Sequence, residues 1–345
     1  MPNQLIEIDG SLGEGGGQIV RTSLSLSMIS GRPFRIYNLR AGRSKPGLLN
    51  QHLTAVKAAQ RISSARVSGM ELGSLQLQFE PQSINAGIYE FDIGTSGSTT
   101  LVLQTILPPL ILSSLASKKS TVRLIGGTHN PLAPTAEFLE KTFLPIINKQ
   151  GPQVEINLAR FGFFPRGGGQ LDIDIEPSES LLPLYIGERK EIKQISASAL
   201  LANLPYSIGQ RELATIKKVL GSLSKSDVIS TSLSAGPGNA VFIHIETDFV
   251  TETFSAIGSR GRKAELVASE ASDKVLSYLA GRAQVGSHLA DQLLIPFSLS
   301  GAGEFVTMPL SGHTLTNIAT VKKFLDIEIN VEHMEEGLEK VSFQS

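Results

Sequence analysis

A glycine-rich loop near the amino terminus constrains the fold of this chain more than any other segment. The loop is Gly13-Glu14-Gly15-Gly16-Gly17-Gln18, between a strand-like run at residues 5–8 and a helical pattern at residues 18–30. A second strand pattern follows at residues 34–37. Three consecutive glycines let the backbone approach a ligand closely, and their N–H groups can bind an anion. The order strand, glycine loop, helix and strand therefore predicts a phosphate site.

Basic residues are concentrated around this loop. Residues 1–66 contain nine Lys or Arg against three Asp or Glu, although the whole chain has 31 basic and 32 acidic residues. Arg21, Arg40, Arg43 and Lys45 belong to this basic segment. Such local basicity favours one anionic ligand at one site over coating of a duplex nucleic acid; a merely solvated basic face is the alternative. The chain has no GxxxxGK[ST] motif, so the site is not the common P-loop.

Length and composition indicate a soluble globular protein of two domains. The chain has 345 residues, of which 41% are hydrophobic and 18% charged, and it has no cysteine. The absence of cysteine excludes disulfides, thiolate catalysis and Cys-ligated metal sites. The amino terminus lacks the pattern of a signal peptide, so we expect a cytoplasmic protein. The most apolar stretch, residues 101–115, is short and contains Pro108 and Pro109, which favours a buried helix over a membrane span.

Strand and helix patterns alternate along the chain and predict the α+β class, with a large domain of β/α units. Four residues of the glycine loop, GGGQ, recur 152 positions later at Gly167 to Gln170, which is weak support for an internal repeat. We interpret the second copy as a structural turn. The charge-richer middle predicts a small inserted α+β domain. The predicted division is a large domain at 1–184, an insert at 185–281 and a return to the large domain at 282–345.

His313 is the strongest candidate for a nucleophile. It lies in Ser311-Gly312-His313-Thr314-Leu315-Thr316-Asn317, just before an apolar helix pattern at residues 318–325. A neutral imidazole can attack an electrophile, glycine leaves access to it, and neighbouring hydroxyl or amide groups can fix its tautomer. A structural histidine that caps a helix is the alternative interpretation.

Taken together, the motifs of this chain resemble those of the RNA 3′-terminal phosphate cyclase family. The resemblance runs from end to end in the family's order, and it implies a large domain of repeated β/α units similar to the carboxyl-terminal domain of translation initiation factor 3 and to enolpyruvyl transferases. The matching segments are Leu12 to Arg21 (LGEGGGQIVR), Arg40 to Leu53 (RAGRSKPGLLNQHL), Gly126 to Thr135 (GGTHNPLAPT), Phe164 to Gln170, Leu289 to Gln292 and Ser311 to Asn317.

The resemblance implies a ligase-type enzyme of RNA processing that acts in three steps. Histidine, here His313, attacks ATP to form a covalent His-AMP and pyrophosphate. AMP then passes to an RNA 3′-phosphate, and the adjacent 2′-hydroxyl closes a 2′,3′-cyclic phosphodiester with release of AMP. Adenylation supplies the leaving group that a phosphate monoester lacks.

The resemblance also implies roles for individual residues. Glu14 would hold a divalent ion, Mg²⁺ or Mn²⁺, which prefers oxygen ligands. Guanidinium groups would bind phosphate charge. The phosphate and RNA contacts would be Arg21, Arg40, Arg43, Gln18 and Gln51, and the ATP contacts would be Gln104, Pro131, His288, Leu289, Ala290, Asp291 and Gln292.

Two positions depart from what the family leads us to expect. His288 replaces a tyrosine, and imidazole stacks on adenine with less surface. His129 stands where an acid or another polar residue is common, and we assign it no role.

Two other functions remain open from the sequence. The family has a non-catalytic, RNA-binding branch that serves ribosome biogenesis, but that branch lacks the active histidine. An enolpyruvyl transferase would share the architecture and a basic site but would need no nucleotide.

Overall fold

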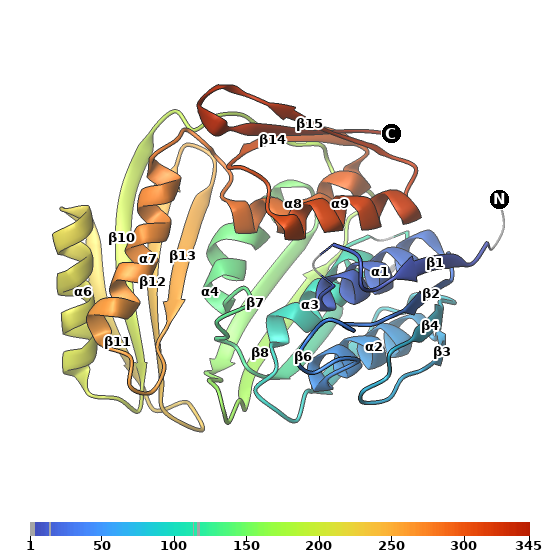
Figure 1. The fold of residues 1–345 in the computed structure, drawn as a ribbon, viewed down its shortest axis with the longest axis horizontal. Helices are drawn as coiled ribbons and strands as arrows, with labels where there is room; N and C mark the ends of the chain where they lie inside the picture. The colour runs from blue at the N-terminus through green and yellow to red at the C-terminus, as the bar shows by residue number, and fades with distance from the viewer. Residues whose placement is uncertain (1–3, 14, 113, 116–117) are drawn as a thin grey trace.

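The computed structural model describes residues 4–13, 15–112, 114–115 and 118–345. Within these residues the strands form four sheets of four strands each, and helices pack between and beside them (Figure 1). This mixture of helices and small mixed sheets agrees with the predicted α+β class. Among the described helices, none is long and apolar enough to cross a membrane.

The first sheet defines a unit of four strands and two helices. Strand β1 pairs in parallel with β2, β2 pairs antiparallel with β4, and β4 pairs antiparallel with β3. Strand, glycine loop and helix follow one another here as the sequence predicts. The elements of this unit are β1 (Ile6–Asp9), α1 (Gly17–Ser30), β2 (Phe34–Tyr37), α2 (Asn50–Ser63), β3 (Arg66–Ser68) and β4 (Leu77–Glu80).

The same unit occurs twice more. In the second unit β5 is parallel to β6, and β8 lies antiparallel between β6 and β7. Its elements are β5 (Ile88–Asp92), α3 (Thr99–Leu110), β6 (Ser120–Gly126), the irregular helix α4 (Ala136–Phe138), η1 (Leu139–Phe143) and α5 (Leu144–Lys149), β7 (Gln153–Arg160) and β8 (Gly169–Glu176).

The third unit closes the chain and has the same pairing of its four strands. Its elements are β9 (Tyr185–Ile186), α8 (Ser287–Ser300), β14 (Ala302–Thr307), α9 (Gly312–Phe324), β15 (Glu328–His333), the short helix η2 (Glu335–Gly337) and β16 (Glu339–Gln344).

The GGGQ recurrence does not mark equivalent positions of these units. The first copy leads into helix α1, whereas the second leads into strand β8. Gly167 and Gly168 have φ angles of 63° and 67°, in the left-handed region that favours glycine. The second copy is thus a turn, and the repeat is carried by the order of elements rather than by this motif.

The remaining sheet belongs to the segment inserted between β9 and α8. Helices α6 and α7 pack on it at one side of the molecule (Figure 1). Strand β9, which the sequence places in the insert, instead pairs with β14 of the third unit, so the sheet of the insert starts at β10. Its elements are β10 (Ile192–Ala202), α6 (Tyr206–Leu220), β11 (Lys225–Thr231), β12 (Gly238–Thr247), β13 (Thr251–Ile257) and α7 (Ala264–Leu279).

Helices of the three units pack on one another in the middle of the molecule. Helix α1 contacts α2, α3 and α9, and α8 packs beside α9. Helix α9 begins at Gly312, six residues before the predicted apolar pattern, because Ser311 caps it by accepting the N–H of Thr314 at 3.2 Å. This packing brings His313, in the first turn of α9, beside the start of α1.

Candidate active site

The glycine loop ends at the amino terminus of α1, where Gly16 is the N-cap. A Cβ added at Gly17 would lie 2.2 Å from Nε2 of His52, so this close approach requires glycine. A Cβ added at Gly16 would lie 3.3 Å from Nη2 of Arg43. The loop therefore lies directly against Arg43, one of the basic residues that the sequence associates with it, and against the imidazole of His52, which the sequence does not predict. Glu14, the predicted metal ligand, lies outside the described residues.

Gln18 joins two residues that the sequence separates widely. Its Nε2 donates to both carboxylate oxygens of Asp291, at 2.7 and 2.8 Å. Its Oε1 is 2.9 Å from Nδ1 of His313. A chain of hydrogen bonds thus runs from Asp291 in α8 through Gln18 in α1 to His313 in α9.

This chain fixes the tautomer of His313. A carboxylate only accepts hydrogen bonds, so the NH₂ group of Gln18 must face Asp291 and its carbonyl oxygen must face His313. The amide oxygen can only accept, so Nδ1 of His313 carries the proton and donates it. In the neutral imidazole this places the lone pair on Nε2, as nucleophilic attack requires.

Asn317 completes the support of Asp291. Its Nδ2 lies 3.2 Å from Oδ1 of Asp291, and its Oδ1 accepts the hydroxyl of Thr22 at 2.7 Å. Burial raises the pKa of Asp291, although the hydrogen bonds from Gln18 and Asn317 oppose this. The sequence suggests that the amide of Asn317 could fix the tautomer of His313 directly, whereas its hydrogen bonds are with Asp291 and Thr22.

Arg21 supplies positive charge beneath the glycine loop. Its Nε donates to Oε1 of Gln104 at 3.3 Å, which brings two predicted ligand contacts together. Burial lowers the pKa of Arg21 to about 10, and the nearby Asp291 opposes this. The guanidinium therefore stays charged at neutral pH.

Arg40 and Arg43 lie close enough to affect each other. Nη1 of Arg40 donates to the carbonyl oxygens of Lys45 and Gly47, at 2.7 and 2.8 Å, and so holds the loop that follows it. Burial lowers the pKa of Arg40, and the charge of Arg43 lowers it further. Because two cations repel each other here, a bound anion would stabilise both.

Sequence reasoning missed His52, a residue of the motif that also contains Gln51. The Nδ1 of His52 accepts the N–H of Leu49 at 3.1 Å, so Nε2 carries the proton in the neutral ring. Burial, Arg21 and Arg40 lower the pKa of His52 to about 3. His52 is therefore a neutral Nε2–H donor beside Gly17 at any physiological pH. The amide oxygen of Gln51 accepts the N–H of Ser98 at 2.8 Å.

The predicted nucleotide contacts differ in how far they can reach a ligand. His288 is partly buried, and burial lowers its pKa. The charges of Lys274 and His313 lower this pKa further, whereas Asp291 opposes the shift. His288 therefore belongs to the cluster around the nucleophile. Leu289 and Ala290 are completely buried in the core, so their side chains present no surface to a ligand. Pro131 lies exposed in the loop after β6, and Gln292 is partly exposed in α8.

No metal cage is found in the part of the chain that the structure describes. There, no three His, Asp or Glu side chains are grouped so that they could hold an ion. The carboxylate of Asp291 is already engaged by Gln18 and Asn317. These residues by themselves do not fit a metal site.

A model of the family described as RNA 3′-terminal phosphate cyclase matches residues 12–331. The chain is 49% identical over 332 residues to the RNA 3′-terminal phosphate cyclase of Koribacter versatilis (strain Ellin345), covering 96% of this chain and 93% of that protein. This chain belongs to the RNA 3′-terminal phosphate cyclase family.

Further relatives agree. The proteins of the same name from Salmonella agona (strain SL483) and Ectopseudomonas mendocina (strain ymp) are each 46% identical to this chain. The first match covers 96% of both chains, and the second covers 100% of this chain and 99% of the other. The resemblance stated from the sequence is confirmed, and so is the prediction that the chain is an enzyme of the cyclase family.

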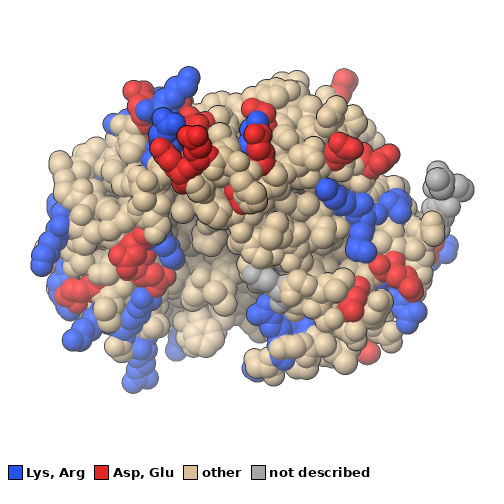
Figure 2. Space-filling view, turned by 45° about the horizontal axis from the view of Figure 1, so that its top comes forward, with Lys and Arg blue, Asp and Glu red and all other residues tan. Residues whose placement is uncertain are grey.

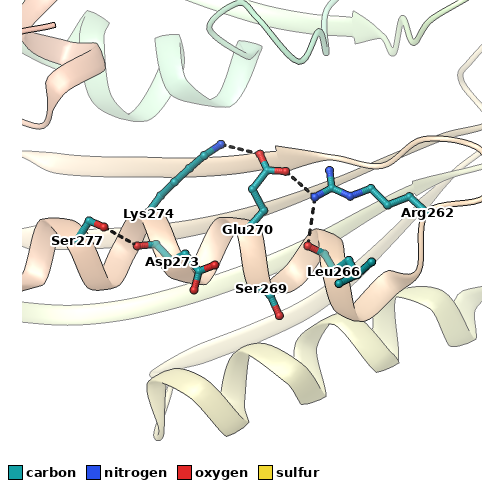
Figure 3. Close-up of a pocket in the computed structure, with 7 residues that line it drawn as sticks. All are labelled: Arg262, Leu266, Ser269, Glu270, Asp273, Lys274 and Ser277. Carbon is teal, nitrogen blue, oxygen red and sulfur yellow. Dashed lines mark hydrogen bonds and ion pairs between the residues drawn. The ribbon is translucent and has the colours of Figure 1, made fainter.

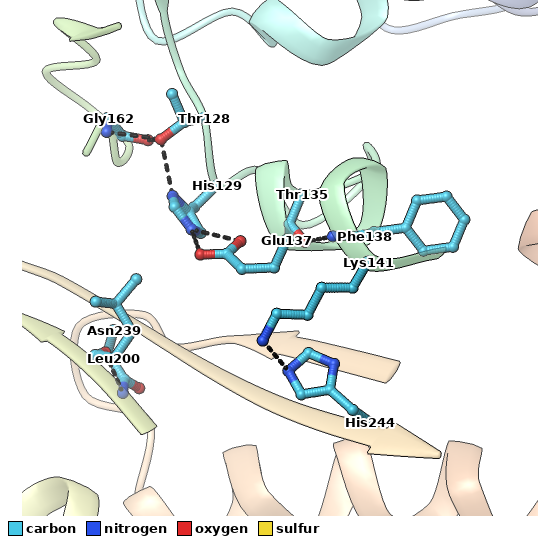
Figure 4. Close-up of polar contacts among 10 residues, drawn as sticks. All are labelled: Thr128, His129, Thr135, Glu137, Phe138, Lys141, Gly162, Leu200, Asn239 and His244. Carbon is cyan, nitrogen blue, oxygen red and sulfur yellow. Dashed lines mark hydrogen bonds and ion pairs between the residues drawn. The ribbon is translucent and has the colours of Figure 1, made fainter. Parts of the chain in front are cut away.

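The unexpected histidine of this cyclase-family chain, His129, has a structural place. It is fully buried, with Nε2 at 3.0 Å from both carboxylate oxygens of Glu137 and Nδ1 at 2.8 Å from Oγ1 of Thr128 (Figure 4). Its ring stacks on Phe163, with ring centres 4.8 Å apart. Burial opposes ionisation of Glu137, but the charge and hydrogen bonds of His129 outweigh it, so the pKa of Glu137 is lowered.

We expect Glu137→Ala to lower the free energy of unfolding by about 3 kcal/mol, because it leaves His129 buried without its acceptor. Glu140→Ala, at an exposed position of the same irregular helix, should change it by less than about 0.5 kcal/mol. Urea denaturation of both variants measures the difference. An equal decrease in the free energy of unfolding of the two variants would contradict a stabilising role of the His129–Glu137 pair.

A shallow pocket lies on α7 and the loop before it, away from the glycine loop. Within it Glu270 pairs with Arg262 at 2.6 Å and with Lys274 at 2.9 Å (Figure 3). Lys274 also lies close enough to His288 to lower its pKa. The pocket contains none of the predicted site residues; it is lined by Arg262, Leu266, Ser269, Glu270, Asp273, Lys274 and Ser277.

Glu252 of β13 connects the insert to the helix that carries Asp291. Its carboxylate accepts the N–H of Gly286, the N-cap of α8. Burial raises the pKa of Glu252 to about 7, against the opposing effect of this hydrogen bond. In the unfolded chain the same group loses its proton near pH 4.5.

We expect Glu252→Gln to make stability less dependent on pH. Between about pH 4.5 and 7 the folded protein keeps a proton that the unfolded chain has lost, so wild-type stability falls as pH rises. The variant should match wild type at pH 4.5 and exceed it by roughly 2–3 kcal/mol at pH 8. Urea unfolding at both pH values, with Glu155→Gln at an exposed position as control, tests this. A difference that is the same at both pH values would contradict it.

Proposed function

We propose that this chain uses ATP to convert an RNA 3′-phosphate into a 2′,3′-cyclic phosphodiester through a His313-AMP intermediate. The hydrogen-bond chain Asp291–Gln18–His313 carries this proposal, because it presents Nε2 of His313 as the nucleophile. The names of the relatives support the overall reaction.

In the first step Nε2 of His313 attacks the α-phosphorus of ATP. The N–P bond forms as the bond to the bridging oxygen breaks, and pyrophosphate leaves with that electron pair. The ring then carries positive charge, which the Nδ1–H bond to Gln18 and the carboxylate of Asp291 behind it stabilise. In the second step an oxygen of the RNA 3′-phosphate attacks the phosphorus of AMP, and the imidazole of His313 leaves. In the third step the 2′-hydroxyl loses its proton and attacks the phosphorus of the 3′-phosphate, and AMP leaves.

Basic groups at the start of α1 support binding of the phosphates. Arg21, Arg40 and Arg43 are placed around the glycine loop, and guanidinium groups bind phosphate oxygens in pairs. His52 would add a neutral N–H donor. Glu14 remains our candidate ligand for a divalent ion that would neutralise phosphate charge. The domain division and the cytoplasmic location also remain predictions.

The proposal is tested by incubating the protein with ATP, Mg²⁺ and a 3′-phosphorylated RNA oligonucleotide, followed by phosphatase. We expect the RNA end to become resistant to phosphatase only when ATP is present. An oligonucleotide with a 3′-hydroxyl serves as the substrate control. If the 3′-phosphate stays sensitive under all conditions, the chain is not a cyclase, and the non-catalytic RNA-binding function gains support.

A further inference from the structure

Six loops gather at one edge of the molecule, and none of them contains an acidic residue. Strands β5, β6 and β7 end at the same edge of their sheet, and β10, β11 and β13 end together in the insert. In Figure 1 these loops form the lower edge. The loop edge comprises residues 93–98, 127–135, 160–168, 203–206, 231–238 and 258–263, and its charged residues are Arg160, Arg166, Arg260, Arg262 and Lys263.

Hydrogen bonds make the loop edge one continuous surface across the second unit and the insert. The N–H of Phe161 donates to the carbonyl of Leu233 at 2.8 Å. Nη1 of Arg166 donates to the carbonyl of Ala235 at 2.7 Å, and within the insert Nδ2 of Asn203 donates to the carbonyl of Ser234 at 3.2 Å. The first two of these bonds join the loops of the second unit to a loop of the insert.

Large apolar side chains stand out of this surface on a rigid base. Phe164 is 74% exposed and Tyr206 is 54% exposed. The residue before Phe164, Phe163, is buried against His129 and accepts the N–H of Gly167 at 2.8 Å. Phe164 is thus an exposed ring on a fixed turn. Two leucines of the same loops, Leu132 and Leu233, are also exposed.

The loop edge is continuous with the phosphate site. A Cβ at Gly167 would lie 2.8 Å from Cα of Ser96, and one at Gly97 would lie 3.1 Å from Cβ of Gln51. Gln51 in turn accepts the N–H of Ser98 at 2.8 Å and is followed by His52, which reaches Gly17. Figure 2 shows the hollow in the middle of the molecule, with Lys and Arg side chains on both sides of its lower part.

We propose that the loop edge binds the single-stranded RNA that precedes the 3′-phosphate, with Phe164 as a stacking platform for a base. This inference rests on the proposed function. Single strands are bound by aromatic faces together with basic groups that follow the backbone, and the absence of acids avoids repulsion of the phosphates. Arg160, Arg166, Arg260 and Lys263 supply the charge, whereas Arg262 is already paired with Glu270.

The test measures binding of a 3′-phosphorylated, 12-nucleotide single-stranded RNA by fluorescence anisotropy. We expect Phe164→Ala to weaken binding about five-fold or more, because stacking on one aromatic ring is lost. Tyr185→Ala, an exposed aromatic of β9, should not weaken it. The double variant Arg260→Glu with Lys263→Glu should weaken binding and lower its salt dependence, whereas Lys217→Glu with Lys218→Glu, at the far end of α6, should not.

A second measurement separates this inference from the proposed function. Labelling of the protein by ATP without RNA should be unchanged in every one of these variants. If Phe164→Ala and the Arg260/Lys263 variant bind RNA as wild type does, or if the control variants weaken binding equally, the inference is overturned while cyclisation can stand. If the wild-type protein fails to cyclise RNA, while the Phe164 and Arg260/Lys263 variants bind RNA more weakly than it does, the proposed function falls and the loop edge remains an RNA surface.

Discussion

Replacing His313 with alanine should reduce both protein adenylation and RNA cyclisation at least about 10⁴-fold, since His313 is the imidazole that Gln18 orients for attack on phosphorus. The hydrogen bonds around Asp291 do not depend on the imidazole, because Gln18 and Asn317 still reach the carboxylate. We therefore expect the variant to fold and to bind ATP. Single-turnover assays with labelled ATP measure the loss.

His333→Ala is the matched control for this variant. His333 is an exposed histidine of β15, paired with Glu339 at 2.9 Å, and it should be dispensable for both reactions. If His313→Ala retains wild-type rates, or if His333→Ala loses activity equally, His313 is not the nucleophile.

Gln18→Ala should have the second-largest effect, a loss of about 10²- to 10⁴-fold in the adenylation rate. The reason is the tautomer: the variant loses the amide oxygen that accepts the proton on Nδ1 of His313, and a histidine in the wrong tautomer loses rates of this order. The affinity for ATP should change little. Rates measured at saturating and limiting ATP separate kcat from KM.

The separate values of kcat and KM also decide between two roles for Gln18. The sequence resemblance implies a contact with phosphate or RNA, and loss of such a contact would raise KM with little change in kcat. The hydrogen bonds to Asp291 and His313 instead predict a fall in kcat. Thr22→Val, which removes only the bond to Asn317, is the milder control in the same helix. A pure KM effect in Gln18→Ala would contradict the positioning role.

The local part of this structure is readable from the sequence because its signals are local. The strand at residues 34–37 matches the prediction. Helix α1 begins at Gly17, one residue before the predicted start at Gln18. Helix α9 begins six residues before the apolar pattern at residues 318–325, because its first turn is polar and only the capping bond of Ser311 marks its start. The Pro pair at 108–109 falls in the last turn of α3, which ends at Leu110.

The sequence names candidate site residues and a reaction, but not how these residues contact one another. Gln18 and Asp291 are 273 residues apart, and no pattern shows that one amide holds a carboxylate with one end and an imidazole with the other. Nothing in the sequence marks His52 itself, because its role depends on the close approach of Gly17. The run of glycines that includes Gly17 indicates only that some group approaches the backbone closely there.

The glycine loop is best understood as the start of a helix that organises the nucleophile. The loop brings Gln18 to the point where α8 and α9 meet, while Arg21 and His52 lie beside it. Positive charge and a fixed imidazole are thus assembled by one short segment. This explains why a loop that looks like a phosphate site also controls a residue almost 300 positions later.

The most direct test of the central claim is to trap the covalent intermediate. The protein is incubated with ATP labelled at the α-phosphate, without RNA, and digested so that the labelled peptide can be sequenced by mass spectrometry. We predict one AMP per protein on the peptide that contains His313, labile in acid and stable in base as a phosphoramidate is. A label on another residue, or no adduct in a protein that nonetheless cyclises RNA, would contradict the mechanism.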